Sequence, residues 1–534
     1  NVQTISKIAD ALGFKSEHVL PYGHYKAKIS LDAIEEGSAS QGKLVVVTGI
    51  TPTPAGEGKT TTAIGLTQGM GRLGHKVSVN LREPTLGPIF GIKGGGTGGG
   101  NARIVPEDEI NIHFTGDAHA VASAHNLLAA LVDNAVFRNA IPDFDPSGIQ
   151  WSRVTDASDR GLRQVIAGVG GSGYGPLREA RFDIVSASEI MAILALADGP
   201  DDLRERISRI VVGATRGGES VTVEQLGVQG ALMTLLHQTV MPNLVQTLEG
   251  QPAIVHAGPF GNIAHGCSSI LADKLALGYA DYVITEAGFA SDLGFEKFMH
   301  IKTRQSGLLP KAAVLVASAR ALKWHDVDRV NRGGPNLAHH VGIVASFGLP
   351  CVVAINRFGS DSPEELAAVR DIALEAGATA AVECDGYAQG GAGAEELAQA
   401  VVDATRAESN ITYAYPLEAT AQEKALALAQ KVYGAADVAW STQATNQLRY
   451  FESQGWGSLP ICMAKTHLSI SHDPSLRNRP QGYTFPINDL RASVGAGFLY
   501  ALAGRIETLP GLPSRPRALD MDVNADGEVI GILN

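Results

Sequence analysis

The sequence has few cysteines, no long apolar run and no excess of positive charge. Four cysteines are scattered through 534 residues without a C-x-x-C pair. This spacing excludes a disulfide framework or a zinc ribbon and is typical of a reducing compartment, so we expect a cytoplasmic protein. In the sequence, no continuous apolar stretch reaches the ~18 residues that a membrane-spanning helix requires. The N-terminal residues mix charged side chains with short apolar runs, unlike a signal peptide.

The net charge of −12 argues against a general binder of nucleic acid or of acidic membranes. A local basic funnel for an anionic substrate is compatible with it. Hydrophobic residues make up 45% of the chain and charged residues 18%, as in an ordinary globular enzyme. At roughly 150 residues per domain, the length predicts about three domains.

The most informative segment is a strand, a glycine loop and a helix start between residues 43 and 62. The apolar residues 44–47 suit a strand covered on both faces. Gly56 and Gly58 leave backbone N–H groups free for phosphate, and a helix starting near Thr60 directs its positive end toward it. Lys59 can reach the β- and γ-phosphates, and the Thr60 hydroxyl can ligate Mg²⁺.

The predicted ATP-binding loop consists of Thr53, Pro54, Ala55, Gly56, Glu57, Gly58, Lys59 and Thr60. Thr53 stands where the usual phosphate-loop pattern has its first glycine, so the loop is atypical. The alternative is an ordinary strand–turn–helix connection with a chance lysine. The flanking pattern favours phosphate binding, because Leu66, Met70 and Leu73 follow at helical spacing and residues 77–81 predict the next strand.

Further short apolar runs predict a wound parallel sheet. They begin at Ile210, Ala253, Tyr282, Ala312 and Cys351. We therefore expect an α/β fold, with a P-loop NTPase-like wound sheet and two smaller α/β domains. The expected domains are residues 1–320, which carry the ATP-binding loop, 321–430, an α/β domain contributing to the site of another substrate, and 431–534, a C-terminal α/β domain.

Two more segments have glycine or polar residues where a site could lie. Residues 91–100 contain seven glycines, which suits either a linker or a loop that closes over a ligand. Arg82 and Glu83 follow the predicted strand 77–81, at the end where open α/β sheets bind ligands. Asp117 could join Glu83 around a cation, or cap the following helix.

Several candidates have plainer alternatives. His113, His119 and His125 suggest zinc, but a spacing of six turns the last two about 240° apart on a helix. His265 and Cys267 could form a nucleophile pair, although such pairs normally meet through space. Phe358 could stack on a flat ring or belong to the core.

These motifs together resemble the formate–tetrahydrofolate ligase family, in its monofunctional form. The matching segments are Pro21-YGHYKAK, Thr53-PAGEGKTTT, Leu81-REPTLGP, Gly91-IKGGGTGGG, His113-FTGDAHA, Gly258-PFGNIAHGC, Thr285-EAGFASDLGFEKF, Ala354-INRF, Pro460-ICMAKT and Pro510-GLP. They extend over nearly the whole chain. The pairing of a phosphate loop that begins with threonine and the seven-glycine run is highly specific.

The resemblance implies ATP-dependent ligation of formate to tetrahydrofolate through formyl phosphate, giving 10-formyltetrahydrofolate, ADP and phosphate. It also implies Mg²⁺ with ATP, activation by K⁺ or NH₄⁺, and a homotetramer. Lys59 would then bridge the transferred phosphoryl group, and Arg82 would grip formate, unless it forms a structural salt bridge. Glu83 and Asp117 would border the monovalent cation.

By the same resemblance, Phe358 and Tyr387 would enclose a flat ring of the folate, although the family pattern has tryptophan at the second position. A P-loop partition or maturation ATPase is the alternative class, but residues 51–54 lack the extra lysine that many of these switches carry. A folate-binding protein without enzymatic activity would leave Lys59 without a role.

Overall fold

The computed structural model describes residues 2–37, 42–326 and 329–532. Its main feature is one twelve-stranded mixed sheet. Ten strands run in the order β1 (Val19–Pro21), β2 (Ala27–Ile29), β13 (Asn243–Thr247), β14 (Pro252–Val255), β4 (Val77–Leu81), β15 (Tyr282–Glu286), β3 (Lys43–Gly49), β16 (Ala312–Ala317), β17 (Cys351–Asn356) and β18 (Ala380–Cys384). β6 (Ala102–Val105) pairs with β13, and β5 (Gly98–Gly99) pairs with β6.

The strands from β14 to β18 are all parallel, and β3 lies inside this set. Their side chains alternate between two apolar layers, as a sheet covered on both faces requires. In β3, Leu44 and Val46 pack into one layer, while Val45 and Val47 pack into the other. The protein is therefore a mixed α/β protein with a large, mostly parallel central sheet, as predicted.

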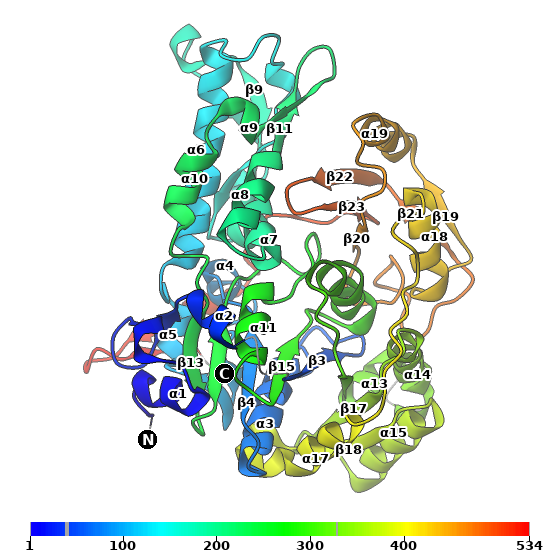
Figure 1. Ribbon diagram of the computed structural model, residues 1–534. Coiled ribbons are helices and arrows are strands. Elements are labelled where there is room, and N and C mark those ends of the chain that lie inside the picture. The colour runs from blue at the N-terminus through cyan, green and yellow to red at the C-terminus, as the bar shows by residue number, and fades with distance from the viewer. Residues whose placement is uncertain (1, 38–41, 327–328, 533–534) are drawn as a thin grey trace.

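Helices cover both faces of this sheet (Figure 1). One layer is shared with α3 (Lys59–Arg72) and α17 (Glu395–Ala404), and the other with α1 (Ile5–Leu12), α11 (Ile270–Leu277) and α14 (Val330–Ser346). The other helices of this part are α2 (Asp32–Gly37), α4 (Leu86–Phe90), α5 (Glu107–Asn111), α12 (Arg304–Ser306), α13 (Ala319–His325), α15 (Pro363–Glu375) and α16 (Gly386–Gln389). In α3, Leu66 and Met70 are buried as predicted, whereas Leu73 is exposed.

Residues 117–240 form a separate apolar cluster beside the sheet, at the upper left of Figure 1. Its helices are α6 (Asp117–Phe137), α7 (Glu189–Leu196), α8 (Pro200–Arg209), α9 (Val223–Leu226) and α10 (Gln229–Leu236). Its short strands pair as β7 (Arg153–Thr155) with β10 (Phe182–Ile184), β8 (Val165–Ala167) with β9 (Arg178–Ala180), and β11 (Val211–Ala214) with β12 (Ser220–Thr222).

Two expectations require correction in this part. The predicted strand at residue 210 exists as β11, but it pairs antiparallel with β12 and lies outside the central sheet. Helix α6 is long and apolar enough to cross a membrane by length and composition, contrary to our reading of the sequence. A core helix passes the same test, and α6 packs against α10 and begins with a buried, ion-paired aspartate.

The C-terminal part carries its own small sheets, and those within residues 437–502 lie toward the right of Figure 1. They pair β19 (Asp437–Trp440) with β21 (Thr484–Ile487), order β20 (Ile461–Ala464), β23 (Phe498–Leu502) and β22 (Asp489–Ser493), and pair β24 (Asp522–Val523) with β25 (Val529–Ile530). The helices there are α18 (Ala421–Lys431) and α19 (Thr442–Ser453). The domain boundary predicted after residue 320 lies between β16 and β17, which are neighbours in the central sheet.

Candidate active site

The glycine loop lies at the carboxyl end of β3, as the sequence predicts. β3 ends at Gly49, and α3 begins at Lys59. Gly56 and Gly58 have φ angles of 77° and 73°, a region that glycine adopts without strain. A Cβ atom on Gly58 would lie 2.5 Å from the side-chain nitrogen of Asn356, at the end of β17. The loop therefore needs glycine at this position for both conformation and space.

Glu57 makes hydrogen bonds within the loop and to two neighbouring segments. One carboxylate oxygen accepts a hydrogen bond from the Thr53 N–H at 3.0 Å, and the other accepts from the Ser318 hydroxyl. The Glu57 carbonyl accepts from the Asn356 amide at 2.8 Å. Thr53, which replaces the usual first glycine, is buried within this network. The loop is thus ordered without a ligand, which lowers the entropic cost of binding one.

Two residues at the start of α3 contact the segment that follows β15. The Lys59 ammonium donates to the Phe289 carbonyl at 2.9 Å. The Thr60 hydroxyl donates to a carboxylate oxygen of Glu286 at 2.8 Å. An ammonium, a hydroxyl and a carboxylate therefore lie together at the carboxyl ends of the central strands β3 and β15. Hydroxyl and carboxylate oxygens are ligands that suit Mg²⁺.

Three cationic side chains influence one another beside the loop. Burial lowers the pKa of Lys59 to about 8; Glu286 opposes this shift and Arg82 adds to it. Burial likewise lowers the pKa of Lys93 to about 8, and Arg82 adds to that shift too. Cations that repel one another favour the binding of an anion, which restores their charge balance.

Lys93 was not among the predicted site residues. It is the one charged residue in the glycine-rich run 91–100, and that was the only signal in the sequence. Arg82 was predicted, and it follows β4 directly. Among the described residues Arg82 makes no ion pair; its guanidinium donates to the Pro259 carbonyl at 3.5 Å, and its buried Nε has no partner. The salt-bridge alternative for Arg82 is therefore not realised.

Glu83 and Asp117 lie together in the interior, as predicted. Burial raises the pKa of Glu83 well above its ordinary value, and the Asp117 carboxylate raises it further. The Lys28 ammonium contacts both Asp117 oxygens, at 2.9 and 3.0 Å, and the Asn243 amide donates to one of them at 2.8 Å. Gly116, not Asp117, occupies the N-cap of α6. Lys28 therefore compensates the charge of Asp117, while burial and Asp117 together disfavour the ionised form of Glu83.

Phe358 and Tyr387 follow β17 and β18, respectively. Phe358 is half-buried rather than part of the core, and the guanidinium carbon of Arg320 lies 4.1 Å from its ring centre. The Tyr387 side chain is 53% exposed. A Cβ atom on Gly99 would lie 3.1 Å from the Tyr387 ring. The glycine run therefore packs against the predicted folate residue instead of linking two domains.

The histidines do not form the zinc site considered from the sequence. His125 is buried, with its ring nitrogens bonded to the Ser188 hydroxyl at 2.7 Å and the Ser152 carbonyl at 3.0 Å. Neither His113 nor His119 belongs to a group of three potential metal ligands within the described ranges. His125 is thus a structural histidine with satisfied hydrogen bonds.

The suggested nucleophile pair is also unsupported. The Cys267 thiol donates to the main-chain carbonyl of His265 at 3.2 Å, not to its ring. Burial raises the pKa of Cys267 to about 11, so the thiol stays protonated at neutral pH. A protonated, buried thiol is a poor nucleophile.

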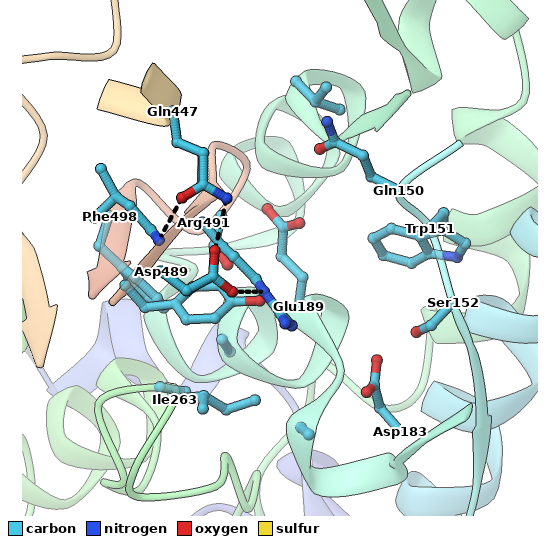
Figure 2. Close-up of a pocket in the computed structure, with 18 of the residues that line it drawn as sticks. Gln150, Trp151, Ser152, Asp183, Glu189, Ile263, Gln447, Asp489, Arg491 and Phe498 are labelled. Carbon is cyan, nitrogen blue, oxygen red and sulfur yellow. Dashed lines mark hydrogen bonds and ion pairs between the residues drawn. The ribbon is translucent and has the colours of Figure 1, made fainter. Parts of the chain in front are cut away.

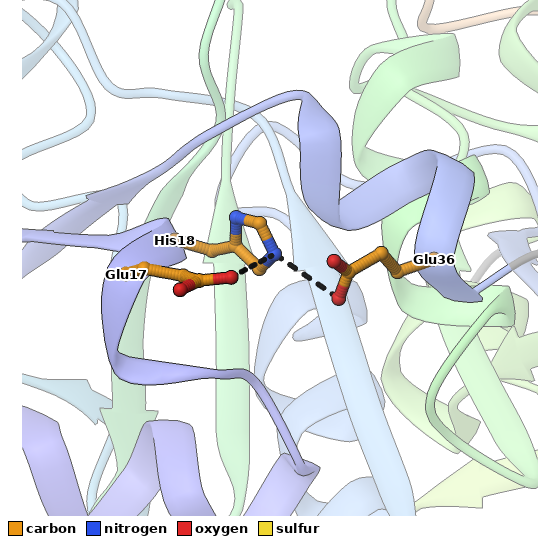
Figure 3. Close-up of side chains that lie close together, drawn as sticks. All are labelled: Glu17, His18 and Glu36. Atoms are coloured by element: carbon orange, nitrogen blue, oxygen red, sulfur yellow. Dashed lines mark ion pairs between the residues drawn. The ribbon is translucent and has the colours of Figure 1, made fainter.

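The described part of the chain has one group of three potential metal ligands, formed by Glu17, His18 and Glu36 (Figure 3). The His18 Nε2 atom lies 3.1 Å from a Glu36 oxygen and 4.0 Å from a Glu17 oxygen. Lys15 already pairs with Glu36 at 2.9 Å. This group shares no residue with the glycine loop, and a surface cluster of charges accounts for it.

Two cavities lie near the loop that follows β14. A cavity of about 330 Å³ is lined by Phe260, Asn262, Thr466 and His467, among others. The His467 ring stacks on Phe289 at 4.8 Å, and Phe289 holds Lys59, so this cavity adjoins the glycine loop. The larger cavity, of about 630 Å³, lies between α7 and the C-terminal strands (Figure 2). Its lining contains none of the predicted site residues.

A glycine loop on a mostly parallel sheet, with cationic side chains and an exposed aromatic ring beside it, is the arrangement expected of an α/β protein that binds an anion. Residues 1–533 match the family model described as formate–tetrahydrofolate ligase. The chain belongs to this family, which confirms the resemblance of its motifs, and it is an ATP-dependent ligase.

Curated relatives agree over the full length. The formate–tetrahydrofolate ligase of Roseiflexus sp. (strain RS-1) is 51% identical, covering 99% of this chain and 98% of the relative. The protein of the same name from Desulforamulus reducens is 49% identical, covering 99% and 97%. That from Myxococcus xanthus is 47% identical, covering 100% and 99%. The similarity therefore includes every part of the fold described above.

Proposed function

We propose that this chain joins formate to N10 of tetrahydrofolate through a formyl phosphate intermediate, using a P-loop NTPase-like site at the edge of the central sheet. The observation that supports it best is the cationic cluster of Lys59, Arg82 and Lys93 beside the glycine loop. ATP phosphorylates formate, and the folate amine then attacks the formyl carbon while phosphate leaves. Both steps concentrate negative charge on phosphoryl oxygens, which such a cluster stabilises.

Each cation has a defined role in this scheme. Lys59 exchanges its Phe289 carbonyl for the β- and γ-phosphate oxygens and bridges the transferred group. The Arg82 fork, free of ion pairs within the described residues, binds the formate carboxylate and later the formyl phosphate. Gly56 and Gly58 contribute backbone N–H groups. Lys93 neutralises charge that develops as the phosphoryl group moves.

Two metal ions fit residues of this site. The neighbouring Thr60 hydroxyl and Glu286 carboxylate form an oxygen pair of the kind that Mg²⁺ prefers, and the ion supplies charge neutralisation to ATP. Glu83 and Asp117 would border K⁺ or NH₄⁺, because a bound cation would favour the ionised form of Glu83, which burial and Asp117 disfavour. That ion would keep Glu83 ionised directly after Arg82.

The folate ring is assigned to Phe358 and Tyr387. Phe358 follows the same strand whose last residue, Asn356, holds the phosphate loop. Tyr387 packs on the glycine run that contains Lys93. Each aromatic is thus tied to one side of the anion site, so the folate amine and the formyl group can be brought together.

The remaining assignments rest on the family. We propose a cytoplasmic homotetramer that binds ATP, formate and tetrahydrofolate, without nucleic acid or membrane partners. We also propose that residues 1–320, 321–430 and 431–534 are three functional regions, of which the first two share one sheet.

One assay tests the reaction. Purified protein receives Mg-ATP and formate, and ADP release is measured with and without tetrahydrofolate. The proposed reaction predicts that ADP release depends on formate and rises with tetrahydrofolate, whereas indifference to both would reject it. Trapping a formyl hydroxamate with hydroxylamine tests for the acyl phosphate itself.

A further inference from the structure

Arg320 connects the two predicted halves of the active site. It lies on α13, directly after the Ser318 cap at the end of β16. Its guanidinium donates to the Gly56 carbonyl in the phosphate loop and lies 3.7 Å from the Glu57 carboxylate. The same group covers one face of the Phe358 ring, with its carbon 4.1 Å from the ring centre. One planar cation therefore contacts both the nucleotide loop and the predicted folate platform.

The chemistry of these contacts is specific to a guanidinium. A planar fork can donate a hydrogen bond at its edge while it stacks on an aromatic face. A lysine ammonium has no flat surface and cannot do both. The Arg320 side chain is 41% exposed, so the guanidinium remains open to a ligand that approaches the loop from solvent.

We propose that Arg320 is a positioning residue that couples nucleotide binding at the glycine loop to folate binding at Phe358. It holds one face of the ring and leaves the other face to the folate. When nucleotide occupies the loop of residues 53–58, it holds the Gly56 carbonyl and Glu57 in place. These two groups fix the guanidinium, and the guanidinium fixes the ring. Folate bound at Phe358 acts on the loop by the same contacts, since coupling between two ligands is reciprocal. This inference rests on the proposed assignment of Phe358 to the folate site.

The decisive measurement is the linkage between the ligands. The Kd of a non-hydrolysable ATP analogue is measured with and without tetrahydrofolate, for wild type and for Arg320→Ala and Arg320→Lys. In the wild type each ligand tightens the other, and in both variants the factor falls to about one. A cation–ring contact of this kind predicts about a 2- to 30-fold loss of tetrahydrofolate affinity in Arg320→Ala.

A matched control is Lys323→Ala, which removes a cation from the same helix. Lys323 pairs with Glu365 at 2.9 Å and, among the described residues, makes no hydrogen bond or ion pair with the loop. The Lys323→Ala variant should therefore keep the wild-type linkage. A purely structural role for Arg320 would change the melting temperature or both affinities but leave the linkage factor intact.

A double-mutant cycle with Phe358→Leu completes the test. If Arg320 acts through the ring, its replacement in the Phe358→Leu background costs little further folate affinity. Equal losses in both backgrounds, or an unchanged linkage factor, would overturn the inference while the ligase assignment stands. A wild-type protein that binds no tetrahydrofolate would reject the proposed function instead.

Discussion

Replacement of Gly58 by alanine is the sharpest probe of the phosphate loop. The φ angle of 73° places alanine in the left-handed region, which costs about 1–2 kcal/mol. The new Cβ atom would lie 2.5 Å from the Asn356 side-chain nitrogen and would displace the amide from the Glu57 carbonyl. Loss of that hydrogen bond adds about 0.5–1.5 kcal/mol.

The sum of about 1.5–3.5 kcal/mol corresponds to about a 10- to 400-fold weaker affinity for ATP, if the loop must return to its present conformation to bind. Gly56→Ala is the matched control. Gly56 has a similar φ of 77°, but a Cβ atom there meets nothing within 4 Å. That variant bears only the backbone cost, which predicts about a 5- to 30-fold loss.

Isothermal titration with an ATP analogue measures both variants, and a thermal unfolding scan verifies that each is folded. Asn356→Ala gives the loop room, so the Gly58→Ala loss should shrink when the two changes are combined. If Gly58→Ala and Gly56→Ala bind ATP equally, or if removal of Asn356 does not lessen the effect, the steric argument fails.

Four further predictions concern the chemistry. Lys59→Ala should lower formate-dependent turnover by about 100-fold or more, as expected for loss of a charge that stabilises the transition state; normal turnover would remove Lys59 from the mechanism. Lys59 and Lys93 have a pKa of about 8, so both lose their charge as the pH rises through this value. ATP affinity should therefore fall between pH 8 and 9, and an affinity that does not change with pH would contradict their anion-binding role. Tyr387→Trp should tighten tetrahydrofolate binding by a few-fold through a larger stacking surface, whereas Tyr387→Ala should weaken it; equal affinities would exclude the ring from the site. Glu83→Gln should weaken the response of the rate to K⁺ titration, while an identical response would place the monovalent cation elsewhere.

The conformation of the glycine loop could be predicted from the sequence because it depends on residues close together in the chain. Alternation in residues 44–47, glycines at positive φ and a following amphipathic segment all depend on near neighbours in the chain. Arg82 was also predictable, since ligands of such sheets bind at the carboxyl ends of strands. These features needed no knowledge of distant contacts.

Other parts of the site depend on pairing across long stretches of sequence. Glu286 and Arg320 reach the loop only because β15 and β16 flank β3, an order that no short segment encodes. Residues 211–214 have the composition of a strand of the central sheet, but they pair with β12 in a separate two-stranded sheet. Lys93 was not predicted because it lies in a glycine run, whose conformation the local sequence does not specify. Its proximity to Arg82 is visible only in the structure.

The continuity of the central sheet determines how this enzyme can be dissected. Five residue pairs join β16 to β17, on either side of the boundary after residue 320. In a fragment ending there, β16 would lose its partner β17, and the edge of this otherwise buried strand would be exposed to solvent. An exposed strand edge of this kind is a template for aggregation. We therefore expect that fragments 1–320 and 321–534 will not stay soluble when they are produced separately. A split protein would have to reassemble by strand complementation, and its activity would report that reassembly.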